Sequence, residues 1–185
     1  MFFKLGIRSV SIDDICHELG ISKKTFYVYF ASKDALVAHL LQVSHSHMTQ
    51  KMEDWLQLGN FKKLITIFLS RKEENSADVR TVPQLVYDLR KYYPCQFAEF
   101  QENVFATQKR YIVLYLQQGI EAGLVRSDLN VETTAMLLAK FHNDTIRDME
   151  SIVAHSDMRR YSQTAKDIFI RGILSEEGLA LYNKE

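Results

Sequence analysis

The chain has 185 residues, enough to bury a hydrophobic core and to divide into a small and a larger domain. Its 23 basic and 23 acidic residues give a formal net charge of zero, which excludes a general electrostatic attraction to nucleic acid. Two cysteines without a spacing pattern exclude a disulfide framework, and no apolar stretch suits a membrane span or a signal peptide, so we expect a cytoplasmic protein.

The first clear helix signal begins at Ser11. Ser11 and Asp14 form a serine cap with an acid three residues later, which is typical of a helix N-terminus. Apolar side chains then recur at helical spacing, at Ile12, Ile15, Cys16 and Leu19. We interpret Cys16 as a small core residue. Gly20 tolerates the positive φ of a sharp turn, so we expect the helix to end there.

A second, short helix is predicted over residues 23–30, with Ser22 as its cap, and Ser32 opens a third helix. Eight residues at about 1.5 Å each make a rod of about 12 Å, which matches the width of the DNA major groove. A helix, a glycine turn and a second short helix form the helix-turn-helix arrangement of DNA-binding proteins.

The second helix divides into an apolar face and a polar remainder. Phe26 and Phe30 are four residues apart, so we expect both to pack inward on Ile15 and Leu19. Lysines can contact phosphates or guanine, threonine can reach a base edge, and tyrosine hydroxyls can bond phosphate oxygens. The predicted DNA-binding residues are therefore Ser11, Lys23, Lys24, Thr25, Tyr27, Tyr29 and Lys33.

An ordinary capped surface helix with two lysines is the alternative interpretation of this segment. The distribution of charge favours DNA binding, though weakly. Residues 1–33 carry five basic and three acidic side chains, whereas residues 34–185 carry 18 and 20. A mildly basic head on a mildly acidic body suits a specific DNA binder that must not coat DNA indiscriminately.

The N-terminal sequence resembles the DNA-binding domain of the TetR family of bacterial transcriptional regulators. The matching segments, in order and without gaps, are Phe2-Phe3, Gly6, Ser9-Val10-Ser11-Ile12, Asp14-Ile15-Cys16, Gly20-Ile21-Ser22, Thr25-Phe26-Tyr27, Tyr29-Phe30 and Ser32-Lys33-Asp34-Ala35-Leu36. The family usually has further residues before this point, so we expect the chain to begin inside its first helix. The resemblance implies an all-α protein, with a helix-turn-helix domain at 1–34 and a helical regulatory and dimerisation domain at 35–185.

Helical periodicity continues through the rest of the chain, which has few glycines and only two prolines. We find no strand pattern and no repeat. The predicted helices span residues 32–57, 61–72, 83–92, 97–123, 131–155 and 161–174, with a polar loop at 73–78.

The last two long helices carry a prediction of a homodimer. Ala165, Ile168, Phe169, Gly172 and Ile173 form one stripe, and Ile170 and Leu174 lie off it, so this helix needs burial on two sides. The resemblance implies a four-helix bundle made by two helices from each subunit. The predicted interface residues are Leu138, Met149, Phe169, Gly172 and Ile173. A wholly intramolecular core is the alternative.

The resemblance also implies a small-molecule effector bound inside the helical body. An apolar cavity with a few polar groups is the usual form of such a site. The candidate lining residues are Phe68, Tyr87, Tyr93, Phe105, Tyr111, Phe141 and His142, although aromatic residues at helical spacing are more often plain core. Nothing in the sequence identifies the effector, and we expect no cofactor and no metal site.

The combined interpretation is a ligand-responsive transcriptional regulator, a repressor that binds a palindromic operator in double-stranded DNA as a homodimer. No phosphate-binding loop, nucleophile elbow or catalytic carboxylate pair occurs, so we do not expect an enzyme. The alternative is a helical protein-interaction or ligand-sequestering module that no longer binds operator DNA.

Overall fold

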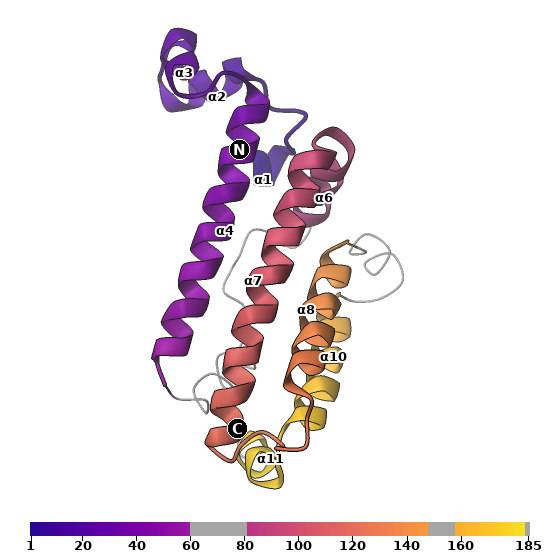
Figure 1. Ribbon diagram of the computed structural model, residues 1–185. Coiled ribbons are helices and arrows are strands. Elements are labelled where there is room, and N and C mark those ends of the chain that lie inside the picture. The colour runs from indigo at the N-terminus through magenta and orange to yellow at the C-terminus, as the bar shows by residue number, and fades with distance from the viewer. Residues whose placement is uncertain (60–80, 148–157, 184–185) are drawn as a thin grey trace. The chain divides into compact units, whose positions relative to one another are not determined.

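The computed structural model describes residues 1–59, 81–147 and 158–183, and all regular secondary structure in these ranges is helical (Figure 1). An isolated bridge between Val125 and Leu174 is the single β-type contact among them. The helices are α1 (Phe2–Leu5), α2 (Ile12–Leu19), α3 (Lys23–Tyr29), α4 (Lys33–Gln57), α6 (Thr81–Tyr92), α7 (Pro94–Glu121), α8 (Val131–Arg147), α10 (Met158–Ile173) and α11 (Glu176–Tyr182). The all-α prediction is confirmed. None of the described helices is long and apolar enough to cross a lipid bilayer.

Local capping forms the helix-turn-helix as predicted. The Ser11 hydroxyl accepts a hydrogen bond from the Asp14 N–H at 3.1 Å, and the Asp14 carboxylate accepts one from the Ser11 N–H at 2.8 Å. Gly20 ends α2 in the left-handed conformation, at φ 64° and ψ 30°. The Ser22 hydroxyl then accepts a hydrogen bond from the Thr25 N–H at 3.0 Å and starts α3. Satisfied N-terminal donors therefore define both helix starts.

A small core holds together the head, which comprises residues 1–34. It consists of Val10, Ile15, Cys16 and Phe26, with Phe2, Ile12, Ile21, Phe30 and Leu36 packed against it. The prediction of Cys16 as a core residue is confirmed. The expectation that Leu19 packs under α3 is wrong, because Leu19 is 64% exposed. It lies in the last turn of α2, where it lines a surface hollow of about 270 Å³ with residues of α1 and α4.

The described residues form two compact units. The first contains those of Met1–Met48 and Asn75–Asn103, and the second contains those of Thr49–Glu74 and Val104–Glu185. Both α4 and α7 contribute residues to each unit. The predicted division into a helix-turn-helix domain and a helical regulatory domain after residue 34 stays a prediction.

The second unit has its own core at the C-terminal end of α7. Leu116, Val125, Ala135 and Leu174 are buried together there. The sequence did not predict α11, a short helix capped by Ser175, whose hydroxyl accepts a hydrogen bond from the Gly178 N–H at 3.0 Å. Gly178 is required at this point, because a Cβ would lie 2.2 Å from the carbonyl oxygen of Leu124.

One predicted boundary needs correction, and three predictions fall wholly or partly outside the described residues. The helix predicted to begin at Phe97 begins at Pro94, because the fixed φ and missing N–H of proline are harmless in a first helical turn. The predicted helix 61–72, the loop 73–78 and the end of the helix 131–155 lie outside the described residues.

Candidate nucleic-acid interface

The orientation of α3 is set by one buried side chain. Phe26 is 3% exposed and contacts Tyr27 and Phe30 through its ring. Successive helical residues are rotated by about 100°, so the positions two before and two after Phe26 point almost directly away from the core. Those positions are Lys24 and Val28, and both are exposed. The outward face of α3 is therefore centred on an ammonium group and an apolar side chain.

Lys24 is the cation that this geometry places at the centre of the face. It forms no ion pair with any residue in the described part of the chain. Lys23 differs, because its ammonium pairs with the Asp13 carboxylate of α2 at 2.7 Å, and this hydrogen bond raises the pKa of Lys23. Of the two predicted phosphate ligands on α3, Lys24 is thus the one available without breaking a contact inside the head.

The hydroxyl candidates differ in the same way. Thr25 Oγ1 lies 2.8 Å from the hydroxyl of Ser22, and the Ser11 hydroxyl donates to the Asp14 carboxylate at 2.7 Å. These bonds from Ser11 also hold the pKa of Asp14 below its usual value. Tyr27 and Tyr29 are exposed on either side of the outward face. The DNA contacts of all these residues stay predictions. The hydroxyls of Ser11 and Thr25 already have partners inside the head, whereas the two tyrosines are exposed.

Lys33 is engaged within the head. Its ammonium donates a hydrogen bond to the carbonyl oxygen of Ile7 at 2.6 Å and lies 6.0 Å from the centre of the Phe2 ring. Partial burial lowers the pKa of Lys33. The structure therefore uses this amine to hold the turn between α1 and α2, and a phosphate contact by Lys33 would compete with that bond.

A buried carboxylate of α6 holds the same turn. Asp88 is 2% exposed and accepts hydrogen bonds from the backbone N–H of Arg8 and from the side-chain amide of Gln84, each at 3.0 Å. The Arg8 guanidinium donates to the Tyr92 hydroxyl and lies 5.0 Å from the centre of that ring. Helix α6 is thus joined to the head through Arg8.

Gly6 makes this contact possible. It has a φ of +78°, and a Cβ there would lie 2.7 Å from Asp88 Oδ2. Sequence reasoning missed Asp88, and the only signal was an acid surrounded by the apolar positions of an amphipathic helix. The sequence prediction also did not single out Val28, which lies four residues after Lys24 on α3.

The predicted effector-binding residues are divided between the two units. Tyr87 and Tyr93 belong to the first unit, and Phe105, Tyr111, Phe141 and His142 belong to the second. Phe68 lies outside the described residues. Tyr93 and Tyr111 are buried, whereas Tyr87 is exposed. The common pocket stays a prediction.

Polar contacts between α4 and α7 lie within the second unit. The Tyr111 hydroxyl donates to the Glu53 carboxylate at 2.6 Å, which raises the pKa of Tyr111. The Tyr115 hydroxyl donates to the carbonyl oxygen of Met52 at 2.6 Å. Tyr111 is therefore a partnered core residue whose hydroxyl already has an acceptor.

The predicted dimer residues have mixed environments. Phe169 is half-buried in α10 and its ring lies 5.0 Å from that of Phe141 in α8, so part of its surface is used inside the subunit. Leu138 and Ile173 are half-buried, and Gly172 is exposed with open space around its Cα. Met149 lies outside the described residues. The predicted interface stays untested.

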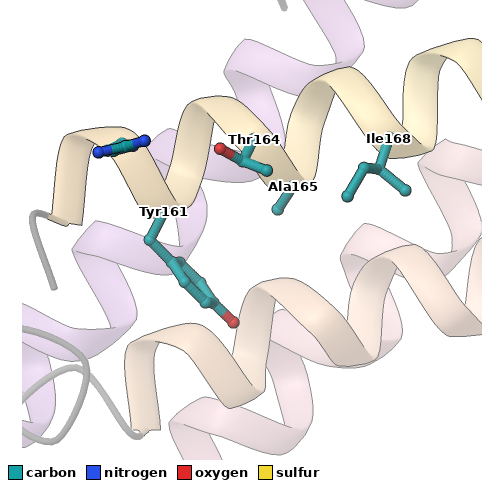
Figure 2. A pocket seen from close by; sticks show the side chains of 5 residues that line it. Tyr161, Thr164, Ala165 and Ile168 are labelled. Carbon is teal, nitrogen blue, oxygen red and sulfur yellow. The ribbon is translucent and has the colours of Figure 1, made fainter. Parts of the chain in front are cut away.

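One face of α10 carries a surface hollow of about 310 Å³. Figure 2 shows its lining side chains, which are Arg160, Tyr161, Thr164, Ala165 and Ile168. Ile168 is 65% exposed, although its side chain is large and apolar. Ala165 and Ile168 belong to the stripe predicted for dimer formation, so this part of the stripe faces away from the subunit core.

Known proteins share both the head and the fold. The family model described as bacterial regulatory proteins, tetR family, matches residues 1–40. The HTH-type transcriptional repressor KstR2 of Mycobacterium tuberculosis is 26% identical over 147 residues, covering 78% of this chain and 72% of that protein. The uncharacterized HTH-type transcriptional regulator YdgC of Bacillus subtilis is 28% identical over 137 residues, covering 72% and 67%.

A solved structure extends the likeness over almost the whole chain. The TetR-family transcriptional regulator from Cytophaga hutchinsonii has a TM-score of 0.67 at 16% identity, covering 95% of this chain and 90% of that one. Sequence likeness in the head, relatives matched beyond it and the shared all-helical fold agree. Residues 1–40 match the TetR family of bacterial transcriptional regulators, and the rest of the chain shares the all-helical fold of the solved TetR-family structure.

Proposed function

We propose that the chain is a ligand-responsive transcriptional repressor that binds a palindromic operator as a homodimer. The observation that carries the proposal is the outward face of α3, where Lys24 points away from the head core and forms no ion pair with a described residue. The helix is short, it is anchored by the buried Phe26, and it carries a cation on its outward face. These features suit insertion into the major groove.

The size of α3 supports this role. Seven residues at about 1.5 Å each make a rod of about 10 Å, and the major groove of B-DNA is about 12 Å wide. Lys24 supplies charge for a phosphate or a guanine, and the phenols of Tyr27 and Tyr29 flank it. The two helices of the motif meet at the turn formed by Gly20, which orients α3 relative to α2.

Dimer formation is supported by the apolar surface of the second unit. Ile168, Leu137 and Met136 are exposed large side chains on α10 and α8. Pairing these helices with a second copy would cover that surface, and twofold symmetry would then present two copies of α3 to two half-sites. The predicted residues Leu138, Phe169, Gly172 and Ile173 lie on the same two helices.

Repression and effector control extend the proposal. The relatives named KstR2 are transcriptional repressors, which supports the same sign of regulation for this chain. An effector that binds best to a state in which the two heads do not fit adjacent major grooves lowers operator affinity by a population shift. Nothing in the described residues identifies that effector. A repressor of this kind acts on the chromosome, and so in the cytoplasm.

Footprinting on the DNA upstream of the chain's own gene tests the proposal. We expect a protected palindrome, with sedimentation of the protein–DNA mixture giving two chains per site. Lys24→Ala should weaken the protected site, whereas Lys140→Ala, at an exposed position of α8, should leave it unchanged. Failure to protect any site, in a protein that is folded by circular dichroism, would favour an interaction module without operator binding.

A further inference from the structure

The outward face of α3 carries an apolar side chain that does not pack in the core of the head. Val28 is 73% exposed, and it is not among the residues that pack against the head core. Valine has a slightly lower helix propensity than alanine because its χ1 is restricted in a helix. Neither helix propensity nor packing inside the subunit therefore favours valine at this position of the seven-residue helix. Its apolar surface is available to a partner.

The neighbours of Val28 indicate the chemistry of that partner. Lys24 is one helical turn away on the same face, so the partner must accept a positive charge beside an apolar contact. Duplex DNA offers both in the major groove. The C5-methyl group of thymine is the apolar group on the base-pair edges there, and phosphates and guanine acceptors lie close to it.

We propose that Val28 is a specificity-determining residue that contacts the C5-methyl group of a thymine in each operator half-site. This inference rests on the proposed function. The four-residue separation of Lys24 and Val28 corresponds to about 6 Å along the helix axis, and base pairs are stacked about 3.4 Å apart. The thymine read by Val28 therefore lies within about two base pairs of the base or phosphate contacted by Lys24.

Deoxyuridine substitution tests the contact one methyl group at a time. Each thymine of the footprinted operator is replaced by deoxyuridine, symmetrically in both half-sites, and the Kd of wild type and Val28→Ala is measured by fluorescence anisotropy. We expect one position where removal of the methyl weakens wild type by about threefold to fivefold per half-site, the cost of about one buried methyl group. Val28→Ala should bind the thymine and deoxyuridine operators equally well at that position.

Two further variants make the result specific. Val28→Thr keeps one of the two methyl groups, so it should retain part of the discrimination between thymine and deoxyuridine. Leu19→Ala removes another exposed apolar side chain of the head, outside α3, and it should discriminate as wild type does. Because Val28 lies outside the core, neither Val28 variant should lower the unfolding midpoint.

The outcomes separate this inference from the function on which it rests. If wild type protects an operator but Val28→Ala discriminates against deoxyuridine as strongly as wild type at every position, Val28 does not read a methyl group and only this inference fails. Unchanged DNA affinity of Val28→Ala together with weaker self-association would assign the residue to a protein contact and also overturn it. Absence of any operator would remove the proposed function itself.

Discussion

Asp88 Oδ2 accepts a hydrogen bond from the backbone N–H of Arg8 at 3.0 Å, and this bond joins α6 to the turn between α1 and α2. The carboxylate is almost completely buried, and its other oxygen is bonded by Gln84. Through this buried carboxylate, α6 is hydrogen-bonded to the backbone segment that leads into the helix-turn-helix.

Removal of the Asp88 carboxylate should destabilise the protein. Asp88→Ala leaves the Arg8 N–H without its acceptor in a partly buried place, which typically costs about 1–3 kcal/mol of unfolding free energy. Urea denaturation checks this result. Asp88→Asn keeps the size and one acceptor oxygen, so it should be destabilised less. Equal stability of wild type and Asp88→Ala would mean that water satisfies the Arg8 N–H.

A methyl group at Gly6 should be more harmful than one at Gly20 for two reasons: the Gly6 backbone, at ψ 159°, lies in a region essentially restricted to glycine, and Asp88 lies close to it. Both glycines have positive φ, +78° and +64°, but only at Gly6 would a Cβ meet Asp88 Oδ2, at 2.7 Å, whereas at Gly20 nothing lies within 4 Å. Gly20→Ala should cost about 1–2 kcal/mol from backbone strain. Gly6→Ala should cost more, as measured by the difference in urea midpoint. Equal destabilisation would show that both α6 and the backbone at Gly6 adjust to the methyl group.

Lys24 and Lys33 should respond differently to mutation, although the sequence predicted phosphate contacts for both. Lys24→Ala should weaken binding to all DNA sequences and lower the salt slope by about one unit for each phosphate that the lysine neutralises. Lys33→Met should chiefly lower thermal stability, because it removes the bond to the carbonyl oxygen of Ile7. Anisotropy titrations at several salt concentrations and thermal melts check both variants. A lower salt slope for Lys33→Met with unchanged stability would contradict this expectation and support a phosphate contact by Lys33.

The α10 face can be tested with neighbouring residues. Ile168→Asp places a charge on an exposed apolar position, so it should produce a folded monomer in sedimentation velocity if this face pairs two copies. Phe169→Asp also removes the ring packed against Phe141, so it should lower the stability of the subunit itself. Gln163→Asp, at an exposed polar position of the same helix, is the control. A stable Ile168→Asp dimer with wild-type dissociation would exclude this part of the face from the interface.

The helix-turn-helix could be predicted from the sequence because it depends on local interactions. The serine caps of α2 and α3, the left-handed Gly20 and the four-residue spacing of Phe26 and Phe30 act within one or two helical turns, so residue order alone predicts them. The start of α7 was predicted three residues too late, because a proline can both end one helix and occupy the first turn of the next, as Pro94 does.

Bonds between segments far apart in the chain had no such local signal. Asp88 binds the backbone of Arg8 across 80 residues, and Lys33 binds the carbonyl oxygen of Ile7 across 26. The sequence alone therefore suggested a phosphate contact for Lys33 and did not single out Asp88. The exposed Leu19 and Val28 were decided in the same way, because burial depends on which element lies opposite a side chain. Sequence by itself determined the family resemblance of the head, most of the helices and the helix-turn-helix segment. Tertiary structure decided which charged and apolar groups of the head stay exposed, because each is either engaged by a partner distant in the chain or left at the surface.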